Sequence, residues 1–183
     1  MTNITILAPV TLESAPETVR PTLEKIKSAY GQVPALMAGM ANSPALLHGY
    51  LALSEQYDQG TLTPEERQYV LLAVSEENEC RFCSAAHATI LKHMLKASPQ
   101  VVEAVRNNQP TGDARRDALV ALARALNTRR GKDVQSELDA FFAAGFTEPQ
   151  VAEVLVGIGL KTMSNTIDHL GHYDLGAFAA EAR

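Results

Sequence analysis

Apolar residues recur along most of the chain at spacings of three and four, the pattern of helices with one buried face. No stretch alternates apolar and polar residues well enough to indicate a strand. The pattern predicts helices over residues 16–30, 35–40, 44–57, 64–77, 80–95, 100–107, 113–128, 134–144 and 149–169. An irregular arm is expected over residues 1–15 and a weakly patterned tail over residues 171–183. The expected fold class is all-α, built from helical hairpins.

The clearest helix start is the segment Thr63–Glu66. Its threonine can cap a helix, its proline suits the first turn, and its two glutamates suit the positive end of the helix dipole. Threonine followed three residues later by glutamate is also a capping-box pattern. The nearly continuous apolar run 69–74 predicts a helix buried on most sides. Asn78 is expected to interrupt this helix, so that Cys80 falls at the N-terminus of the next one.

Length, charge and composition favour a globular protein. The chain has 183 residues and a net charge of −5, which suits a single domain that we expect to span residues 1–183. Acidic and basic residues are interspersed, so no basic block indicates a nucleic-acid surface. Residues 1–12 lack the pattern of a signal peptide, and no window reaches the roughly 18 apolar residues of a membrane helix. We therefore expect a soluble, cytoplasmic protein without nucleic-acid or membrane partners.

Candidate chemistry concentrates in residues 80–87. Cys80 and Cys83 are the only cysteines of the sequence, and His87 follows four residues after the second. In a cytoplasmic protein such a pair is more often catalytic or metal-binding than a structural disulfide. On a helix the three side chains share one face, and His87 lies one turn from Cys83, where it can take a proton from the thiol. The stretch therefore predicts thiol redox chemistry.

Two other interpretations of this stretch stay open. Free cysteines are often buried as small hydrophobic residues, and His87 could equally be a core histidine. A structural zinc site needs four ligands, whereas Cys80, Cys83 and His87 supply three and the sequence has no further cysteine. His93 is expected to point elsewhere on the helix. A three-ligand catalytic zinc is a further alternative, although we expect neither a metal nor a cofactor.

The segments 63–68, 70–74 and 78–87 together resemble the core of the AhpD-like alkylhydroperoxidases, which belong to the carboxymuconolactone decarboxylase superfamily. The resemblance is strongest over residues 62–95 and looser elsewhere. It implies an AhpD-like all-α fold, usually assembled as trimers or hexamers. It also implies that Cys80 and Cys83 reduce hydroperoxides by cycling between dithiol and disulfide, with His87 in a proton relay. The implied reductant is a thiol or dithiol, such as that of a lipoyl protein.

Two positions depart from the family pattern. The glutamate that the family relay has twelve residues before the first cysteine is replaced by Gln68, which cannot accept a proton. The histidine that AhpD has just before the second cysteine is replaced by Phe82. The nearest acidic residues in sequence, Glu76 and Glu77, could substitute for the missing carboxylate, or could simply be a solvated helix end. The candidate catalytic residues are therefore Cys80, Cys83, His87, Glu76, Glu77 and Gln68.

The expected function is a thiol-dependent peroxidase. The alternatives are a non-catalytic redox-sensing helical oligomer and a lyase like the decarboxylase branch, although that branch lacks the cysteine pair. Which cysteine attacks the peroxide is open, because Cys83 is nearer His87 whereas Cys80 could be more exposed at the helix start. Polar residues near the end of the last helix could line a pocket or subunit contact, or form an exposed helix end; they are Asn165, Asp168, His169 and His172. His48 is expected in the core, at an interface or in the pocket.

Overall fold

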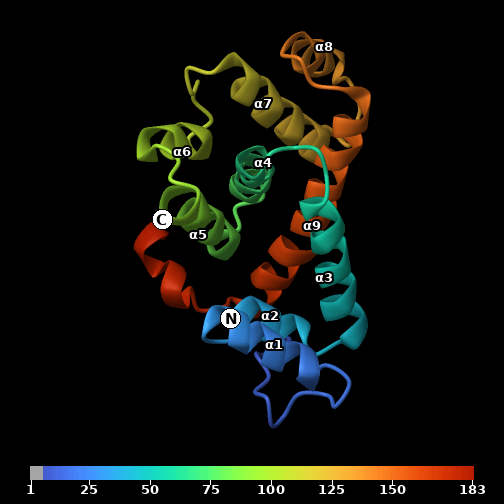
Figure 1. Ribbon diagram of the computed structural model, residues 1–183, viewed down its shortest axis with the longest axis vertical. Helices are drawn as coiled ribbons and strands as arrows, with labels where there is room; N and C mark the ends of the chain where they lie inside the picture. The colour runs from blue at the N-terminus through green and yellow to red at the C-terminus, as the bar shows by residue number, and fades with distance from the viewer. Residues whose placement is uncertain (1–5) are drawn as a thin grey trace, which may run out of the picture.

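The computed structural model describes residues 6–183, and in this range it contains nine α-helices and no β-strand (Figure 1). The helices are α1 (Arg20–Tyr30), α2 (Ala35–Met40), α3 (Pro44–Asp58), α4 (Pro64–Glu77), α5 (Arg81–Thr89), α6 (Pro99–Arg106), α7 (Ala114–Arg129), α8 (Gln135–Ala143) and α9 (Glu148–Gly171). A π-helical turn, η1 (Ile90–Met94), extends α5, and a 3₁₀ helix, η2 (Gly176–Glu181), lies near the C-terminus. The all-α prediction is confirmed.

The first helix starts later than its apolar pattern predicts. Residues 16–19 form a turn, and α1 begins at Arg20 with Pro21 in its first turn. A helix from residue 16 would place Pro21 in its interior, where the ring clashes with the carbonyl of residue 17 and one hydrogen bond is lost. The predicted arm begins in residues 1–5, which lie outside the described residues, and it is irregular from residue 6 onward.

The expected capping box is present at the start of α4. The Glu66 amide donates to Thr63 Oγ1 at 3.2 Å, and the Thr63 amide donates to Glu66 Oε2 at 2.8 Å. The helix ends at Glu77, and Glu79 adopts a left-handed conformation with φ of 56° before α5 begins. This sharp junction turns the chain so that Cys80 becomes the N-cap of α5, as the sequence predicts.

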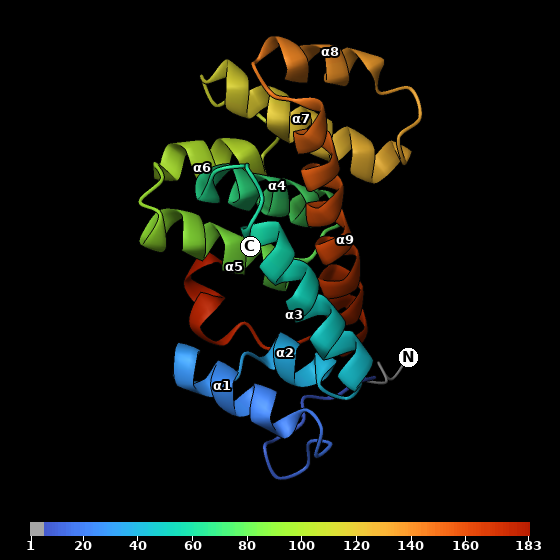
Figure 2. The same cartoon turned by 45° about the vertical axis from the view of Figure 1, so that its right-hand side comes forward.

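Helix α4 lies in the middle of the molecule and packs against α5, α7 and α9 (Figure 1). Every residue from Tyr69 to Ser75 is buried, which explains why its sequence is apolar on nearly all sides. The long helix α9 runs beside α3 (Figure 2) and crosses α4 closely at Gly157. A Cβ atom at Gly157 would lie 3.0 Å from Val70 Cγ1 of α4 and 2.8 Å from the Tyr57 hydroxyl of α3, so glycine allows α9 to approach both helices.

The C-terminal tail is more ordered than its weak pattern predicts. Helix η2 packs against α5, where the ring of Phe178 meets the ring of Phe82 edge-on with 5.6 Å between centroids. The Lys92 ammonium in η1 also binds the Glu181 carboxylate at 2.7 Å. These tertiary contacts, rather than local amphipathicity, hold the tail over the start of α5. Within residues 6–183, none of the helices has both the length and the apolar character needed to span a membrane.

Candidate functional site

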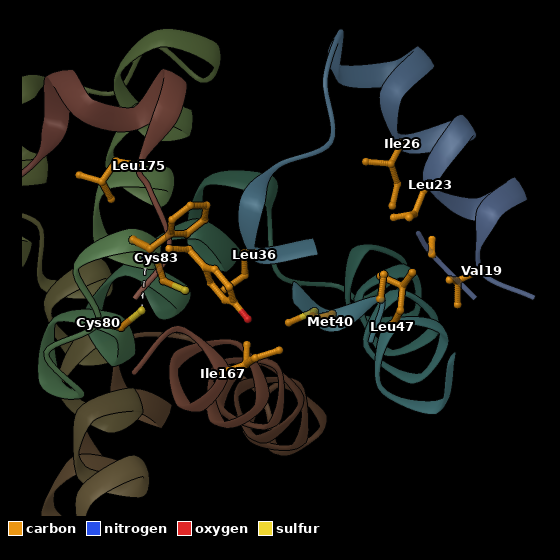
Figure 3. Close-up of a cluster of buried hydrophobic side chains, with 14 of the residues drawn as sticks. Val19, Leu23, Ile26, Leu36, Met40, Leu47, Cys80, Cys83, Ile167 and Leu175 are labelled. Atoms are coloured by element: carbon orange, nitrogen blue, oxygen red, sulfur yellow. Dashed lines mark hydrogen bonds between the residues drawn. The ribbon is translucent and has the colours of Figure 1, made fainter. Parts of the chain in front are cut away.

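Both cysteines are free and buried at the N-terminus of α5, with fractional exposures of 0% for Cys80 and 2% for Cys83. Figure 3 shows their sulfur atoms inside an apolar cluster that includes Met40 and Ile167. The Cys80 sulfur caps the helix by accepting the Cys83 amide proton at 3.4 Å. The expectation that Cys80 is the more exposed thiol is wrong, because the N-cap position faces the core here.

Helices α5 and α9 face each other through three pairs of polar side chains. Cys80 Sγ lies 3.3 Å from Asp168 Oδ2, Cys83 Sγ lies 3.6 Å from Ser164 Oγ, and His87 Nε2 lies 2.7 Å from Lys161 Nζ. From one pair to the next the residue number increases on α5 and decreases on α9, so the two helices are antiparallel at this contact. Spacings of three and four residues keep each set on one helix face. Cys80, Cys83 and His87 therefore share a face, as the sequence predicts.

The hydrogen bonds of His87 fix its tautomer. Its Nε2 must accept, because its partner is the Lys161 ammonium, which can only donate. The ring proton is therefore on Nδ1, which donates to Gln68 Oε1 at 2.8 Å. Burial and the nearby Lys161 charge hold the pKa of His87 well below its ordinary 6.5. His87 is a neutral ring whose two nitrogens are engaged by Gln68 and Lys161 rather than by the Cys83 thiol.

Lys161 is the charged group that the sequence reading missed. Its side chain is buried, with a fractional exposure of 1%, and no carboxylate of residues 6–183 forms an ion pair with it. Burial disfavours the ammonium, but negative charge on Cys83 outweighs burial and raises the pKa of Lys161. A buried cation thus lies on the same side of α5 as the reactive cysteine pair.

The two thiols differ in their electrostatic surroundings. A hydrogen bond from Cys80 lowers the pKa of the Cys83 thiol, and the Lys161 charge adds to this effect against the opposing effect of burial. The same hydrogen bond raises the pKa of Cys80, together with burial and the negative charges of Cys83 and Asp168. The Cys80 proton therefore has two anionic acceptors, the Cys83 sulfur and the Asp168 carboxylate. These shifts favour the thiolate at Cys83 and the thiol at Cys80.

Glu76 and Glu77 do not reach the cysteines. Glu76 binds Arg106 at 2.6 Å, and Glu77 binds Arg124 at 2.6 Å. Both carboxylates are engaged by arginines on α6 and α7, so the expectation that one of them replaces the relay glutamate does not fit this geometry. Asp168 is the carboxylate that contacts a thiol.

The polar residues at the end of α9 divide into two groups. Asn165 and Asp168 are buried, and Asn165 accepts a hydrogen bond from the Asn78 amide at 2.9 Å, so neither is part of an exposed helix end. His169 and His172 are exposed and line a cavity of about 390 Å³. His48 is also exposed and lies 3.1 Å from Thr22 Oγ1, so it is not a core residue, and its expected place at an interface or in a pocket stays a prediction.

Two cavities meet at Phe82, one of the two residues between the cysteines. The larger, of about 650 Å³, lies under the N-terminal arm, α1 and the C-terminal tail, and its walls include Leu23, Leu175 and Phe178. The smaller, of about 390 Å³, is lined by Glu79, Arg81, Phe82, Asp168, His169, His172 and Tyr173. Because Asp168 lines the smaller cavity and contacts Cys80, one side chain separates this cavity from the cysteine pair.

The zinc alternative has little support in this geometry. Residues 6–183 contain no group of three histidine, cysteine, aspartate or glutamate side chains arranged to hold a metal ion. Both ring nitrogens of His87 are already engaged, and the Lys161 ammonium would repel a cation at this position.

A sequence signal for the missed residues does exist. Lys161, Ser164 and Asp168 recur at spacings of three and four along α9, directly after the apolar run 154–160. Polar residues at this spacing share one helix face, and on a buried helix such a face needs polar partners. The pattern alone does not say which helix supplies those partners.

Comparisons with known proteins support the resemblance seen in the sequence. The sequence model of the carboxymuconolactone decarboxylase family matches residues 44–125. A search of curated proteins finds no match to the chain.

Solved structures share the fold over nearly the whole chain. An alkylhydroperoxidase AhpD core protein from Ralstonia eutropha, described as peroxidase-related, has 22% identity and a TM-score of 0.78, covering 90% of this chain and 88% of its own. A variant of the debrominase Bmp8 in complex with 2,3,4-tribromopyrrole has 16% identity and a TM-score of 0.79, covering 97% and 96%. A peroxidase-related protein from a Silicibacter species has 19% identity and a TM-score of 0.74, covering 95% and 94%. At these identities the likeness establishes a common fold.

Proposed function

We propose that this chain, which has the AhpD-like fold, is a thiol-dependent peroxidase of the carboxymuconolactone decarboxylase superfamily. The observation that carries the proposal is the asymmetry of the cysteine pair. Cys83 lies in the field of a buried cation, while Cys80 keeps its proton beside a carboxylate. One nucleophilic thiolate and one protonated partner are what a two-cysteine peroxidase needs.

In the first step, the Cys83 thiolate attacks one oxygen of the hydroperoxide. An S–O bond forms and the O–O bond breaks, which oxidises Cys83 to a sulfenic acid and reduces the peroxide. The leaving oxygen takes a proton and departs as water or an alcohol. In the second step, the Cys80 sulfur attacks the sulfenic sulfur, an S–S bond forms and water leaves. A thiol or dithiol reductant then restores both cysteines.

The test is peroxide consumption by the purified protein with a dithiol donor, using hydrogen peroxide and an organic hydroperoxide. Wild-type protein is expected to turn over, whereas Cys83→Ser and Cys80→Ser should both lose turnover. In Cys80→Ser the sulfenic acid should still form once, because the attacking thiolate remains. Lys132→Met, which removes an exposed charge between α7 and α8, is the matched control and should keep full activity.

Other outcomes would favour the alternatives. Reversible disulfide formation without turnover would favour a redox sensor. Activity that survives both serine substitutions would overturn the redox proposal and favour a lyase. Turnover of a bromopyrrole in place of peroxides would indicate reductive dehalogenation by the same dithiol. Assembly as a trimer or hexamer and reduction by a lipoyl protein stay predictions.

A further inference from the structure

We infer that Lys161 carries the proton of the redox cycle, as an ammonium while Cys83 is a thiolate and as a neutral amine once the disulfide has formed. This inference rests on the proposed dithiol–disulfide cycle but assigns a role to a residue outside the cysteine motif. Lys161 would also take over the role of the relay carboxylate, whose position is occupied by Gln68.

The buried Lys161 ammonium needs a compensating negative charge. Removing an ammonium from water costs several kcal/mol unless an anion or strong acceptors compensate for its lost hydration, and Lys161 is fully buried. No carboxylate of the described chain pairs with it, and Asp168, two turns further along α9, is engaged with Cys80. Tyr50 is close, but burial raises the pKa of its phenol and keeps it neutral. The Cys83 thiolate is the remaining anion.

The order of the side-chain pairs between α5 and α9 places Lys161 next to the pair that contains Cys83. Lys161 and Ser164 share a face of α9, and they lie opposite His87 and Cys83, which share a face of α5. Lys161 is therefore held one turn from the Ser164 hydroxyl that contacts the Cys83 sulfur. The titratable groups that act on that sulfur are Tyr50 of α3, Cys80 at the start of α5 and Lys161 of α9. His87 and Asp168 lie one contact further away, on Lys161 and Cys80.

Lys161 is held in place by the His87 ring. His87 accepts one of its three N–H bonds and is fixed as an acceptor by Gln68. A glutamate at position 68 would favour a charged imidazolium, which could no longer accept from an ammonium. Glutamine keeps the ring neutral, so this chain combines a non-ionisable residue at position 68 with a cation at position 161. The proton that the family relay places on histidine and glutamate is carried here by lysine.

The protons of the proposed cycle balance when Lys161 is the proton donor. The starting state holds a Cys83 thiolate, a Cys80 thiol and the Lys161 ammonium. Reaction with one hydroperoxide gives the disulfide, one alcohol, one water and the neutral Lys161 amine, with the ammonium supplying the proton that the leaving oxygen takes. Reduction by two external thiols yields their disulfide and returns one proton to Cys80 and one to Lys161. In the oxidised state the buried ammonium would have no anion, so it is expected to be neutral.

The test is a thiolate titration that requires no turnover. In the Cys80→Ser background, ultraviolet absorbance against pH reports Cys83 alone. Lys161→Met should move the titration midpoint up by about one pH unit or more, a roughly tenfold loss of thiolate below it. Lys161→Arg, which keeps a positive charge, should retain part of the shift, and Lys132→Met should leave the midpoint unchanged.

A folding measurement accompanies the titration. Removing one partner of a buried charge pair is destabilising, so Lys161→Met should unfold at a lower temperature than the wild type, with Lys161→Arg closer to it. An unchanged Cys83 midpoint in a folded Lys161→Met protein would overturn the inference even if the protein is a peroxidase. A shifted midpoint in a protein without peroxidase activity would uphold Lys161 as the cation that stabilises the Cys83 thiolate, but it would refute the proposed function and, with it, proton transfer from Lys161 to a peroxide oxygen.

Discussion

The Cys80 sulfur and an Asp168 carboxylate oxygen lie 3.3 Å apart, although 88 positions separate the two residues along the chain. The site therefore does contain a carboxylate, but it faces the first cysteine and comes from the last helix. Its negative charge opposes ionisation of Cys80, just as the Lys161 charge favours ionisation of Cys83. The contact between α5 and α9 thus favours a protonated thiol at Cys80, beside Asp168, and a thiolate at Cys83, toward Lys161.

We expect Asp168→Asn to lower the pKa of Cys80. In the Cys83→Ser background the substitution removes a negative charge but keeps the size and one acceptor oxygen, so the thiol should ionise about one pH unit lower. Absorbance of the thiolate against pH is the measurement. Asp174→Asn, an exposed aspartate on the wall of the larger cavity, is the matched control and should have no effect. An unchanged Cys80 titration in Asp168→Asn would show that burial alone keeps this thiol protonated.

We expect Gln68→Glu to change the charge of His87. A carboxylate in place of the amide would accept the Nδ1 proton and stabilise the imidazolium, which raises the pKa of His87. Nitrogen-detected NMR of the imidazole should show wild-type His87 as the neutral Nδ1–H tautomer down to pH values well below 6.5. The variant should show a charged ring at neutral pH. A variant ring that stays neutral would mean that the Lys161 charge dominates at this position.

Acid should destabilise the protein through His87. The pKa of this histidine is lowered in the folded state, so below pH 6.5 the unfolded chain takes up a proton that the folded chain does not. Stability is therefore fully present above pH 6.5 and falls as the pH drops, by about 2 kcal/mol from pH 8 to pH 5 for this residue.

Urea unfolding at several pH values measures this effect. His87→Gln, which keeps an acceptor for Lys161, should lose less stability over the same range. His48→Gln changes an exposed histidine and is the control, since it should follow the wild type. Equal acid sensitivity of wild type and His87→Gln would contradict a neutral buried ring.

We expect Phe178→Ala to expose the thiols. The Phe178 ring packs on Phe82, between the two buried cysteines, and holds the tail over this part of α5. Its loss should make local opening easier by about 1–2 kcal/mol and speed alkylation of the cysteines by about 5–30-fold. Mass spectrometry after timed iodoacetamide treatment gives the rates. Phe142→Ala, which truncates a phenylalanine of α8 that is 42% exposed, should leave them unchanged; equal rates in all three proteins would show that opening does not involve the tail.

The local architecture of the site could be predicted from the sequence. The capping box at Thr63, the end of α4 and the position of Cys80 at the start of α5 depend on residues within a few positions of one another. The same holds for the shared face of Cys80, Cys83 and His87. Such features follow from helix geometry and capping preferences, which a sequence pattern records directly.

The partners of these residues could not be predicted in the same way. Lys161 and Asp168 reach the site only because α9 packs on α5 in one particular register, and that register depends on the shapes of both helices. Glu76 looked available in the sequence because Arg106, which binds it, is 30 positions away. The tail is held by contacts to α5 and η1, so its own pattern is weak.

The N-cap of α5 links the oxidation state of Cys80 to the backbone of the helix. The sulfur that accepts the Cys83 amide proton is the same Cys80 atom that would be joined in a disulfide. A disulfide sulfur is a poorer acceptor than a thiol that shares its proton with an anion, so the first turn of α5 should loosen on oxidation. Deuterium uptake at the Cys83 amide would then report the redox state of the protein, and helix fraying would accompany each turn of the chemistry.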